Sequence, residues 1–417
     1  MSTALPILSA ADRGILRALA ARKAEIAALP CHADTIRRCR ALNALKPERP
    51  LVMIDQLPWN ELGTGGELTL HCENPAARGI EHNLRYQLYR WDHLRGDLVI
   101  RREYGVYPAG ADLDFGIPIE DTVLHTEEDN QVKAHAYRDL LATDEDIARI
   151  TDAAITYDAA ATQARMAWLS DIFGDILEIR IEGVVPALSI WDRITERRGA
   201  DALVLDLIDR PEHTHALMRR LCAVYQDYLT QLERLGLLEA APATIHCTGG
   251  FAEELPAPGF VPDRPRLKDT WAYGMSQIFS TVGSAMHDEY EIQYMIPLFE
   301  RMGLVYYGCC EPLDRKIDII RRLPNVRKVS MSPWADPARG AEAIGGDYVF
   351  SHKPNPAFLA TDALDEGLVL GELTRVRDAC RANGTPVEYI LKDVSTVRHD
   401  EKKLWHWHDI VMDFVGA

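Results

Sequence analysis

The chain is poor in basic residues, with 46 lysines and arginines against 63 aspartates and glutamates, a formal net charge of −17 over 417 residues. A surface with this excess of negative charge repels polyphosphate chains and anionic lipid headgroups. Long apolar runs are also missing, whereas a membrane-spanning helix needs about 20 apolar residues. We therefore expect neither a nucleic-acid partner nor a membrane partner.

Several well-known sequence signatures are missing as well. The chain has no GxxxxGK[ST] phosphate loop, no glycine-rich dinucleotide fingerprint and no GxSxG nucleophile turn. Its eight cysteines form no CxxC pair, so each is expected to be a buried thiol, a metal ligand or a nucleophile. The N-terminal stretch has no basic region followed by a long apolar segment and instead predicts a helix after Ser9. We expect no signal peptide and a cytoplasmic location.

Short runs rich in β-branched and aromatic residues alternate with helical stretches along most of the chain. These runs predict eight strands: Leu51–Ile54, Asp97–Arg102, Leu177–Val185, Ala243–Cys247, Leu304–Cys309, Val326–Ser332, Asp347–Ser351 and Val387–Leu391. Eight strands alternating with helices favour a closed (β/α)8 TIM barrel in the α/β class. We predict one such barrel over residues 51–417, a helical N-terminal extension over residues 1–50, and inserted loops at 104–125 and 249–271.

Thiol and imidazole groups follow several of the predicted strands. In a (β/α)8 barrel the carboxyl ends of the strands form the active site. Thiolate and imidazole together suit Zn²⁺, which makes candidate ligands of His246, Cys247, Cys310 and His352. The alternative for each is a buried thiol or a hydrogen-bonded structural imidazole. Cys309 and Cys310 point in opposite directions if the strand continues, so we do not expect both at one site.

Aromatic and acidic side chains follow the same predicted strands. The aromatic residues could form the wall of an apolar substrate site, or they could pack the barrel. The carboxylates could act as proton donors or ligands, or they could cap the next helix. The candidates for substrate binding are Asp55, Trp59, Trp191, Tyr307 and Trp334, and the candidates for catalysis are Glu311 and Asp393.

The second half of the chain resembles the uroporphyrinogen decarboxylase superfamily. The stretch Ser284–Arg301 (SAMHDEYEIQYMIPLFER) is similar to a helix that enters the barrel in that superfamily. The next stretch, Leu304–Leu313 (LVYYGCCEPL), resembles the zinc-binding strand end of its corrinoid methyltransferases, which reads His-x-Cys-Gly. Cys310 falls on the family's cysteine, and Gly308 replaces the histidine. Tyr348–Pro356 (YVFSHKPNP) loosely resembles the superfamily's Gly-Asn-x-Asp-Pro turn, and the resemblance extends over about residues 170–417 and more weakly over 50–110.

This resemblance implies a zinc-dependent methyltransferase. Such an enzyme demethylates a small O-, S- or N-methyl compound and passes the methyl group to cobalamin on a separate corrinoid protein. The zinc would act as a Lewis acid on the departing group. Because Gly308 replaces the family's histidine, His246, Glu311 or His352 would have to complete the ligand set. The implied partners are a small methylated substrate and a corrinoid protein, and a homodimer is a possible assembly.

Two other functions stay open at this point. The first is a metal-independent decarboxylase or lyase on the same barrel, which needs cationic side chains such as Arg85, Arg101 or Lys353 at its mouth. The arginine-rich substrate motif of the decarboxylase is missing from Leu51–Glu61 (LVMIDQLPWNE), which counts against that particular enzyme. The second is a non-catalytic corrinoid- or metal-binding protein.

Overall fold

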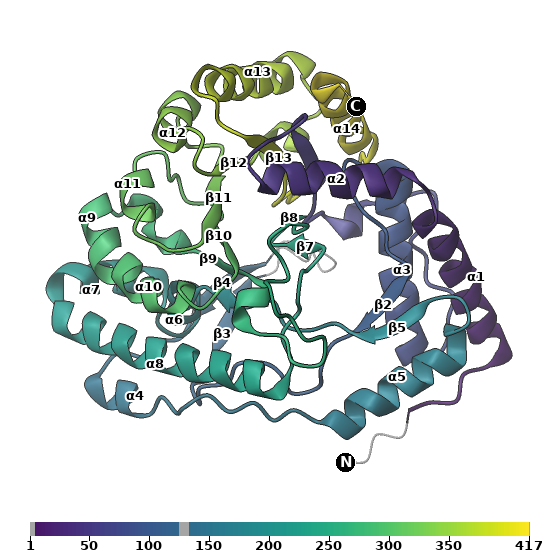
Figure 1. The fold of residues 1–417 in the computed structure, drawn as a ribbon, viewed down its shortest axis with the longest axis horizontal. Helices are drawn as coiled ribbons and strands as arrows, with labels where there is room; N and C mark the ends of the chain where they lie inside the picture. The colour runs from purple at the N-terminus through teal and green to yellow at the C-terminus, as the bar shows by residue number, and fades with distance from the viewer. Residues whose placement is uncertain (1–4, 125–132, 417) are drawn as a thin grey trace.

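The computed structural model describes residues 5–124 and 133–416, and Figure 1 shows their arrangement. Seven parallel strands form a central sheet in the order β1-β13-β12-β11-β10-β9-β6. Their bounds are β1 (Leu51–Ile54), β6 (Ala187–Leu188), β9 (Trp271–Gly274), β10 (Leu304–Tyr307), β11 (Val326–Met331), β12 (Val349–His352) and β13 (Val387–Leu391). The predicted α/β class, with a parallel sheet flanked by helices, is confirmed.

Six shorter or separate strands lie outside this sheet. The parallel pair β2 (Glu103–Val106) and β5 (Glu178–Ile181) forms a two-stranded sheet of its own. Among the described residues, no ladder of backbone hydrogen bonds joins this pair to β1 or β6. Two antiparallel hairpins complete the set, β3 (Asp121–Leu124) with β4 (Ala134–Tyr137) and β7 (Thr244–Ile245) with β8 (Thr248–Gly249).

Helices surround the central sheet on its outer side (Figure 1). They begin and end at residues suited to those positions. For example, Asp336 accepts hydrogen bonds from the first amides of α12, and α8 ends at Gly236 with φ 67°. The α-helices are α1 (Ala10–Ala27), α2 (Cys31–Asn43), α3 (Pro75–His93), α4 (Asp144–Ala148), α5 (Ala159–Phe173), α6 (Ile190–Arg198), α7 (Ala200–Asp209), α8 (Pro211–Leu235), α9 (Ser284–His287), α10 (Gln293–Phe299), α11 (Ile317–Ile320), α12 (Pro337–Ile344), α13 (Glu366–Asn383) and α14 (Lys402–Val415). Short turns of 3-10 type are η1 (Trp59–Glu61), η2 (Leu267–Asp269), η3 (Gln277–Thr281) and η5 (Pro356–Ala360), and η4 (Asp288–Ile292) is a π-helical turn. No helix in the described parts of the chain is both long enough and apolar enough to cross a bilayer.

Five of the eight predicted strands match strands of the sheet, and three do not. The predicted strand at 97–102 is wrong in position, because β2 begins at Glu103. The predicted strand at 177–185 contains β5, which pairs with β2 outside the central sheet, and β6 of that sheet begins only at Ala187. The predicted strand at 243–247 is wrong in type, because it forms one arm and the turn of the β7–β8 hairpin. Its place in the sheet is taken by β9, which begins at Trp271, where the predicted loop 249–271 ends.

The predicted N-terminal extension and first inserted loop contain regular structure. Helices α1 and α2 occupy most of residues 1–50, and α1 buries Leu16 and Ala20 in an apolar cluster with residues of α3 and α5. The predicted loop at 104–125 contains most of β2 and all of β3. Its last residue lies outside the described residues.

The seven-stranded sheet has an inner face, which faces the β7–β8 hairpin, and an outer face, which faces the helices (Figure 1). The inner face carries a buried ion pair in the first half of its strands. Lys328 Nζ lies 3.0 Å from Glu388 Oε2, and neither side chain is exposed. Burial alone would raise the pKa of Glu388, but the Lys328 ammonium and hydrogen bonds from Ser351 and Thr248 hold it below its usual value. The pair therefore stays charged in the protein interior.

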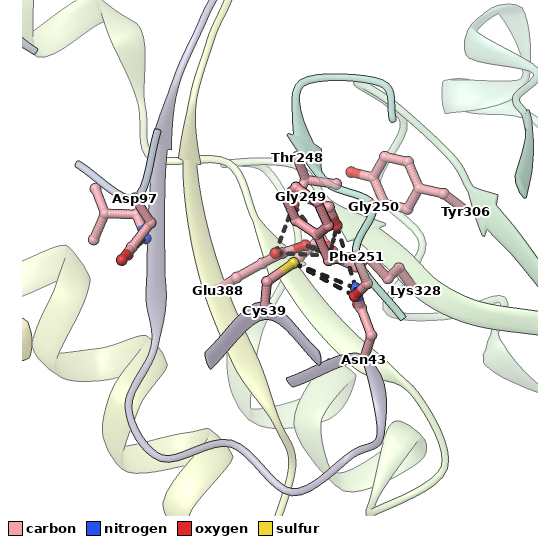
Figure 2. Close-up of polar contacts among 12 residues, drawn as sticks. Cys39, Asn43, Asp97, Thr248, Gly249, Gly250, Phe251, Tyr306, Lys328 and Glu388 are labelled. Carbon is pink, nitrogen blue, oxygen red and sulfur yellow. Dashed lines mark hydrogen bonds and ion pairs between the residues drawn. The ribbon is translucent and has the colours of Figure 1, made fainter. Parts of the chain in front are cut away.

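This ion pair attaches the hairpin to the sheet (Figure 2). Thr248 donates to Glu388 Oε2 at 2.7 Å, and Lys328 Nζ donates to the carbonyl of Gly249 at 3.2 Å. From the other side, Asn43 at the end of α2 donates to the carbonyls of Gly249 and Phe251, at 3.3 and 2.7 Å. The base of the hairpin is thus held by α2 and by the inner face of the sheet.

The ion pair predicts a large effect of removing one partner. Lys328→Met leaves the Glu388 carboxylate buried without its counter-ion, so we expect a loss of about 3–5 kcal/mol in the free energy of unfolding. The double variant Lys328→Met/Glu388→Leu removes both charges, and we expect it to lose less than the single variant. Urea unfolding at neutral pH measures both. A single variant that unfolds at the wild-type urea concentration would contradict this account of the pair.

Candidate active site

The β7–β8 hairpin has an unusual two-residue turn, His246-Cys247. Both residues have positive φ, 37° and 70°, as the tight turn of a two-residue hairpin requires. Asparagine and glycine adopt this conformation readily, whereas other residues lose about 1–2 kcal/mol each. Strained turns of this kind occur most often at functional sites. The strained turn therefore makes the tip of the hairpin a candidate functional site.

The tip of the hairpin reaches the aromatic residues of the inner face. The His246 ring stacks on Tyr273 of β9, with ring centroids 4.9 Å apart and an angle of 20° between the planes. The Tyr306 ring of β10 lies 5.5 Å from it. Cys247 packs with Met53 and Ile390, and burial raises the pKa of its thiol to about 12. Cys247 is thus a neutral, buried thiol, while the imidazole of His246 faces the ends of the strands.

The carboxyl ends of β10, β12 and β13 on the inner face, together with the hairpin tip, form what we call the mouth. At its centre lies Cys309, whose Sγ accepts a hydrogen bond from Lys392 Nζ at 2.8 Å. The hydrogen bond with Cys310 holds the pKa of Cys309 well below its usual value, helped by His246 and by the charge of Lys392 and opposed by burial. Cys309 is therefore a thiolate at neutral pH, the form of cysteine that acts as a nucleophile.

The side chains next to Cys309 interact with its negative charge. Cys310 Sγ lies 3.5 Å from Cys309 Sγ and 3.2 Å from Asp393 Oδ2, so its single S–H proton can be donated to either atom. The adjacent thiolate and burial raise the pKa of Cys310, so Cys310 keeps its proton. Burial would lower the pKa of Lys392, but the negative charges of Cys309 and Asp393 hold it above its usual value. One thiolate, one thiol and one ammonium group are therefore in contact here.

A second lysine, Lys353, lies at the end of β12 on the inner face. It is buried, and its amino group donates a hydrogen bond to the Tyr306 hydroxyl. Burial lowers the pKa of Lys353 to about 8, and the positive charge of Lys392 contributes to the shift. At pH 7 about a tenth of the Lys353 side chains are then free amines, far more than for an ordinary lysine. A free amine is the form that adds to a carbonyl group.

Two carboxyl groups border the same site. Glu311 is fully buried and accepts hydrogen bonds from the amides of Ser276 and Cys309, at 3.1 and 2.8 Å, which fixes the turn after β10. Asp192 of α6 accepts from Gln277 Nε2 at 3.1 Å. Partial burial raises the pKa of Asp192 to about 7, and the charges of Glu311 and Cys309 add to the rise. Asp192 can therefore give or take a proton near neutral pH.

A cavity of about 500 Å³ adjoins the mouth through Tyr273, the residue on which His246 stacks. Its walls are aliphatic and phenolic, and its cationic group is Arg193 of α6. This volume is within the range of small-molecule sites. The residues that line it are Tyr107, Asp112, Leu113, Val184, Val185, Ala187, Arg193, Tyr225, Tyr228 and Tyr273.

The structure brings four of the predicted site residues together around Cys309. Cys310 and Asp393 contact each other, the amide of Cys309 binds Glu311, and His246 is close enough to lower the pKa of Cys309. Asp55, at the end of β1, is half-buried, and its charge acts on Cys247.

The expectation that Cys309 and Cys310 would point apart is wrong, because their sulfur atoms lie 3.5 Å apart. The strand ends at Tyr307, and Gly308, with φ 92°, turns the chain and interrupts the alternation.

Two predicted site residues face away from the mouth. Because residues alternate along β12, Ser351 and Lys353 lie on the inner face and His352 on the outer one, where its Nε2 lies 3.2 Å from Glu372 of α13. Tyr307 also faces the helices, and its hydroxyl lies 2.8 Å from both His287 Nε2 and Glu291 Oε2.

The three predicted tryptophans lie apart from the Cys309 cluster. Trp191 is fully buried and donates to the carbonyl of Tyr290 at 3.2 Å. Trp59 stacks on Tyr86 of α3, with ring centroids 3.8 Å apart. Trp334 is 75% exposed and lines a separate cavity. The sequence pointed to Lys353 only as a requirement of the alternative function, and it did not lead us to propose Lys392, Asp192, Tyr273 or Arg193 as site residues.

The residues at the mouth do not fit a preformed zinc site. Within residues 5–124 and 133–416, no group of three or more histidine, cysteine, aspartate or glutamate side chains is arranged to hold a metal ion. His352 lies on the other side of the sheet, and the Lys392 ammonium already pairs with Cys309. A cation in that position opposes the binding of a second cation to the same thiolate.

Comparison with known proteins adds no family assignment. A scan against models of protein families finds no match, and a search of curated proteins finds none. The chemistry of the site therefore has to be argued from its own residues.

The hairpin turn gives a test of its strain. The double variant His246→Asn/Cys247→Gly has the residues that a tight two-residue turn prefers. We expect its free energy of unfolding to rise by about 1 kcal/mol, because relief of the strain of two residues with positive φ outweighs the lost stacking of His246 on Tyr273 and the lost packing of Cys247. Urea unfolding measures this, with Cys247→Gly alone as the control. A loss of more than about 1 kcal/mol in the double variant would show that the two side chains stabilise the fold more than their backbone strains it.

Proposed function

We propose that the chain is a metal-independent enzyme that cleaves a carbon–carbon bond in a small oxo acid, as a decarboxylase or a related lyase. The observation that carries this proposal is Lys353, a buried amine with a pKa of about 8 beside a second lysine. An amine that is desolvated next to another cation is a recognised form of nucleophilic lysine, which forms imines with carbonyl substrates. Of the three cationic residues that this function led us to expect, Lys353 lies at the mouth. Arg85 pairs with Glu81, and Arg101 pairs with Glu103.

The residues around Lys353 can perform each step of such a reaction. The free amine adds to the ketone carbon, water leaves, and a protonated imine remains. When the carbon–carbon bond breaks, carbon dioxide departs from a carboxylate, or an aldehyde departs as the Asp192 carboxylate takes the proton of its hydroxyl group, and the electron pair of that bond moves into the imine. Asp192 or the Cys310 thiol then gives a proton to the carbon, and water releases the product from Lys353. Arg193 in the adjoining cavity can bind a carboxylate of the substrate.

We also propose that the strands close into a (β/α)8 barrel around this site. The pair β2–β5 would fill the space between β1 and β6. On one side, the amide of Asp97, which precedes β2, donates to the carbonyl of Val52 in β1 at 2.8 Å, and on the other side a short segment joins the end of β5 at Ile181 to the start of β6 at Ala187. Closure would place Lys353, Cys309 and Lys392 at the carboxyl end of the barrel, where the active sites of such enzymes lie.

The zinc-dependent methyltransferase expected from the resemblance stays a second proposal. One observation favours it: Cys309 and Cys310 bring two sulfur atoms within 3.5 Å of each other, next to His246. Three such donors suit zinc if Lys392 moves away from Cys309. This function would also require cobalamin on a corrinoid partner protein and a small methylated substrate.

Metal content distinguishes the two proposals. We expect the protein, purified without chelators, to contain far less than one zinc per chain, because Lys392 opposes a cation at Cys309. Elemental analysis of the wild type and of Cys310→Ala measures this. About one zinc per chain in the wild type, lost in Cys310→Ala, would contradict the lyase proposal and favour methyl transfer.

Reductive trapping tests the proposed role of Lys353. The protein is incubated with acetoacetate or pyruvate and treated with sodium borohydride, which reduces an imine to a stable amine. We expect peptide mass spectrometry to find the adduct on Lys353. Lys353→Arg keeps the charge but cannot form the imine, and Lys402→Arg changes an exposed lysine as the matched control. Equal labelling of wild type and Lys353→Arg would contradict the role of Lys353.

The pKa of Lys353 predicts the pH dependence of that trapping. Only the deprotonated amine attacks a carbonyl, so the rate of adduct formation should rise about tenfold per pH unit below about pH 8 and level off above it. Initial rates measured over a series of buffers test this. A rate that keeps rising to about pH 10 would mean that Lys353 has the pKa of an ordinary exposed lysine.

A further inference from the structure

The adjacent thiols of Cys309 and Cys310 differ from the other cysteines of the chain. Their sulfur atoms are 3.5 Å apart, and a disulfide bond is about 2.05 Å long, so a shift of about 1.5 Å would join them. Cys39, Cys72, Cys222 and Cys380, in contrast, are buried apart from the mouth.

The two sulfur atoms are also in different chemical states. Cys309 accepts the hydrogen bond of the Lys392 ammonium at 2.8 Å, which stabilises a negative sulfur. Cys310 is partly exposed, and its sulfur lies 3.2 Å from the carboxylate of Asp393, which is exposed. A small oxidant can therefore approach from the side of Cys310 and meet a thiolate that has a second thiol in contact with it. A reactive thiolate with an adjacent second thiol is the arrangement found in redox-sensitive sites.

We propose that Cys309 and Cys310 form a reversible disulfide when the protein meets a hydroperoxide. In the first step, the Cys309 thiolate attacks one peroxide oxygen. A sulfur–oxygen bond forms, the oxygen–oxygen bond breaks, and the departing alkoxide or hydroxide takes a proton from water. In the second step, the Cys310 sulfur attacks Cys309, the sulfur–oxygen bond breaks, and hydroxide leaves with the Cys310 proton as water. The two sulfurs are oxidised by two electrons in total, and the peroxide is reduced to an alcohol or water.

The bridge would change the charge of the mouth. Joining the sulfurs removes the negative charge that Lys392 contacts and leaves Asp393 as a partner, at 3.1 Å from Lys392 Nζ. It also ties together two residues of the turn that Glu311 fixes through the amide of Cys309. A dithiol reductant would restore both thiols by exchange. This modification does not depend on which reaction the mouth catalyses.

Peptide mapping of the full-length protein tests the proposal. Reduced protein is treated with a small excess of hydrogen peroxide, its remaining thiols are alkylated, and its peptides are analysed by mass spectrometry. We expect two of the eight cysteines to escape alkylation, and a peptide with Cys309 bonded to Cys310 that lacks two hydrogen atoms. Treatment with dithiothreitol should restore both alkylation sites.

Variants identify the order of the two steps. In Cys310→Ser the reaction should stop at a Cys309 sulfenic acid, which dimedone labels. In Cys309→Ser, Cys310 should stay a thiol at the same peroxide dose. Cys222→Ser, a buried cysteine outside the mouth, should behave as the wild type does.

Two results with the wild-type protein would overturn the proposal without any variant. The first is oxidation of Cys309 to a sulfinic acid while Cys310 stays free. The second is a disulfide between Cys309 and Cys247, the other thiol on the inner face.

Discussion

The buried ion pair between Lys328 and Glu388 fixes the β7–β8 hairpin on the inner face of the sheet. Neither charge reaches water, so each needs further hydrogen bonds, and the β7–β8 hairpin provides them through Thr248 and the carbonyl of Gly249. If the hairpin left the inner face, the buried charges of Lys328 and Glu388 would lose the hydrogen bonds that it provides. Such a loss around buried charges is energetically costly. Its attached base positions its tip, and the tip places His246 against Tyr273 and near Cys309.

The charges at the mouth depend on one another. Lys392 keeps its proton because Cys309 is negative, and Cys309 is negative because Lys392 donates to it and the Cys310 thiol is in contact with it. Lys353 forms no ion pair with any residue that the structure describes, and burial and the Lys392 charge favour its neutral form. In a buried site these interactions are only weakly screened, so a single substitution is expected to shift several groups at once. Lys392, which is paired with a thiolate, and Lys353, which is not, therefore have different chemistry although they follow neighbouring strands.

Much of the sheet could be predicted from the sequence, because β1, β10, β12 and β13 are continuous runs of buried residues and β11 departs from this only at Arg327. The hairpin could not, because His246-Cys247 lacks the asparagine and glycine that signal a tight turn. The segment 243–247 has the β-branched residues of a strand and was placed in the sheet for that reason, while β9 is only four residues long and ends in glycine.

The candidate site was predicted in its location but only partly in its residues. Residues after the strands were the right ones to search, and Cys310, Glu311, Asp393 and His246 are near Cys309. The choice of His352 over Lys353 depended on which face of β12 each residue occupies, and a strand's inward face is not evident from a fully buried run. The placement of Cys309 depended on the turn at Gly308, which local sequence does not specify.

The most direct test of the account is the pH dependence of Cys309 alkylation by iodoacetamide, measured on the Cys309 peptide by mass spectrometry. If Cys309 is a thiolate paired with Lys392, the wild-type rate should stay nearly constant from about pH 5 to about pH 8. In Lys392→Met the rate should fall at the acidic end of that range, while Lys402→Met should match the wild type. A wild-type rate that rises about tenfold per pH unit toward about pH 8.5, as for an ordinary thiol, would contradict the charge arrangement on which the proposed chemistry rests.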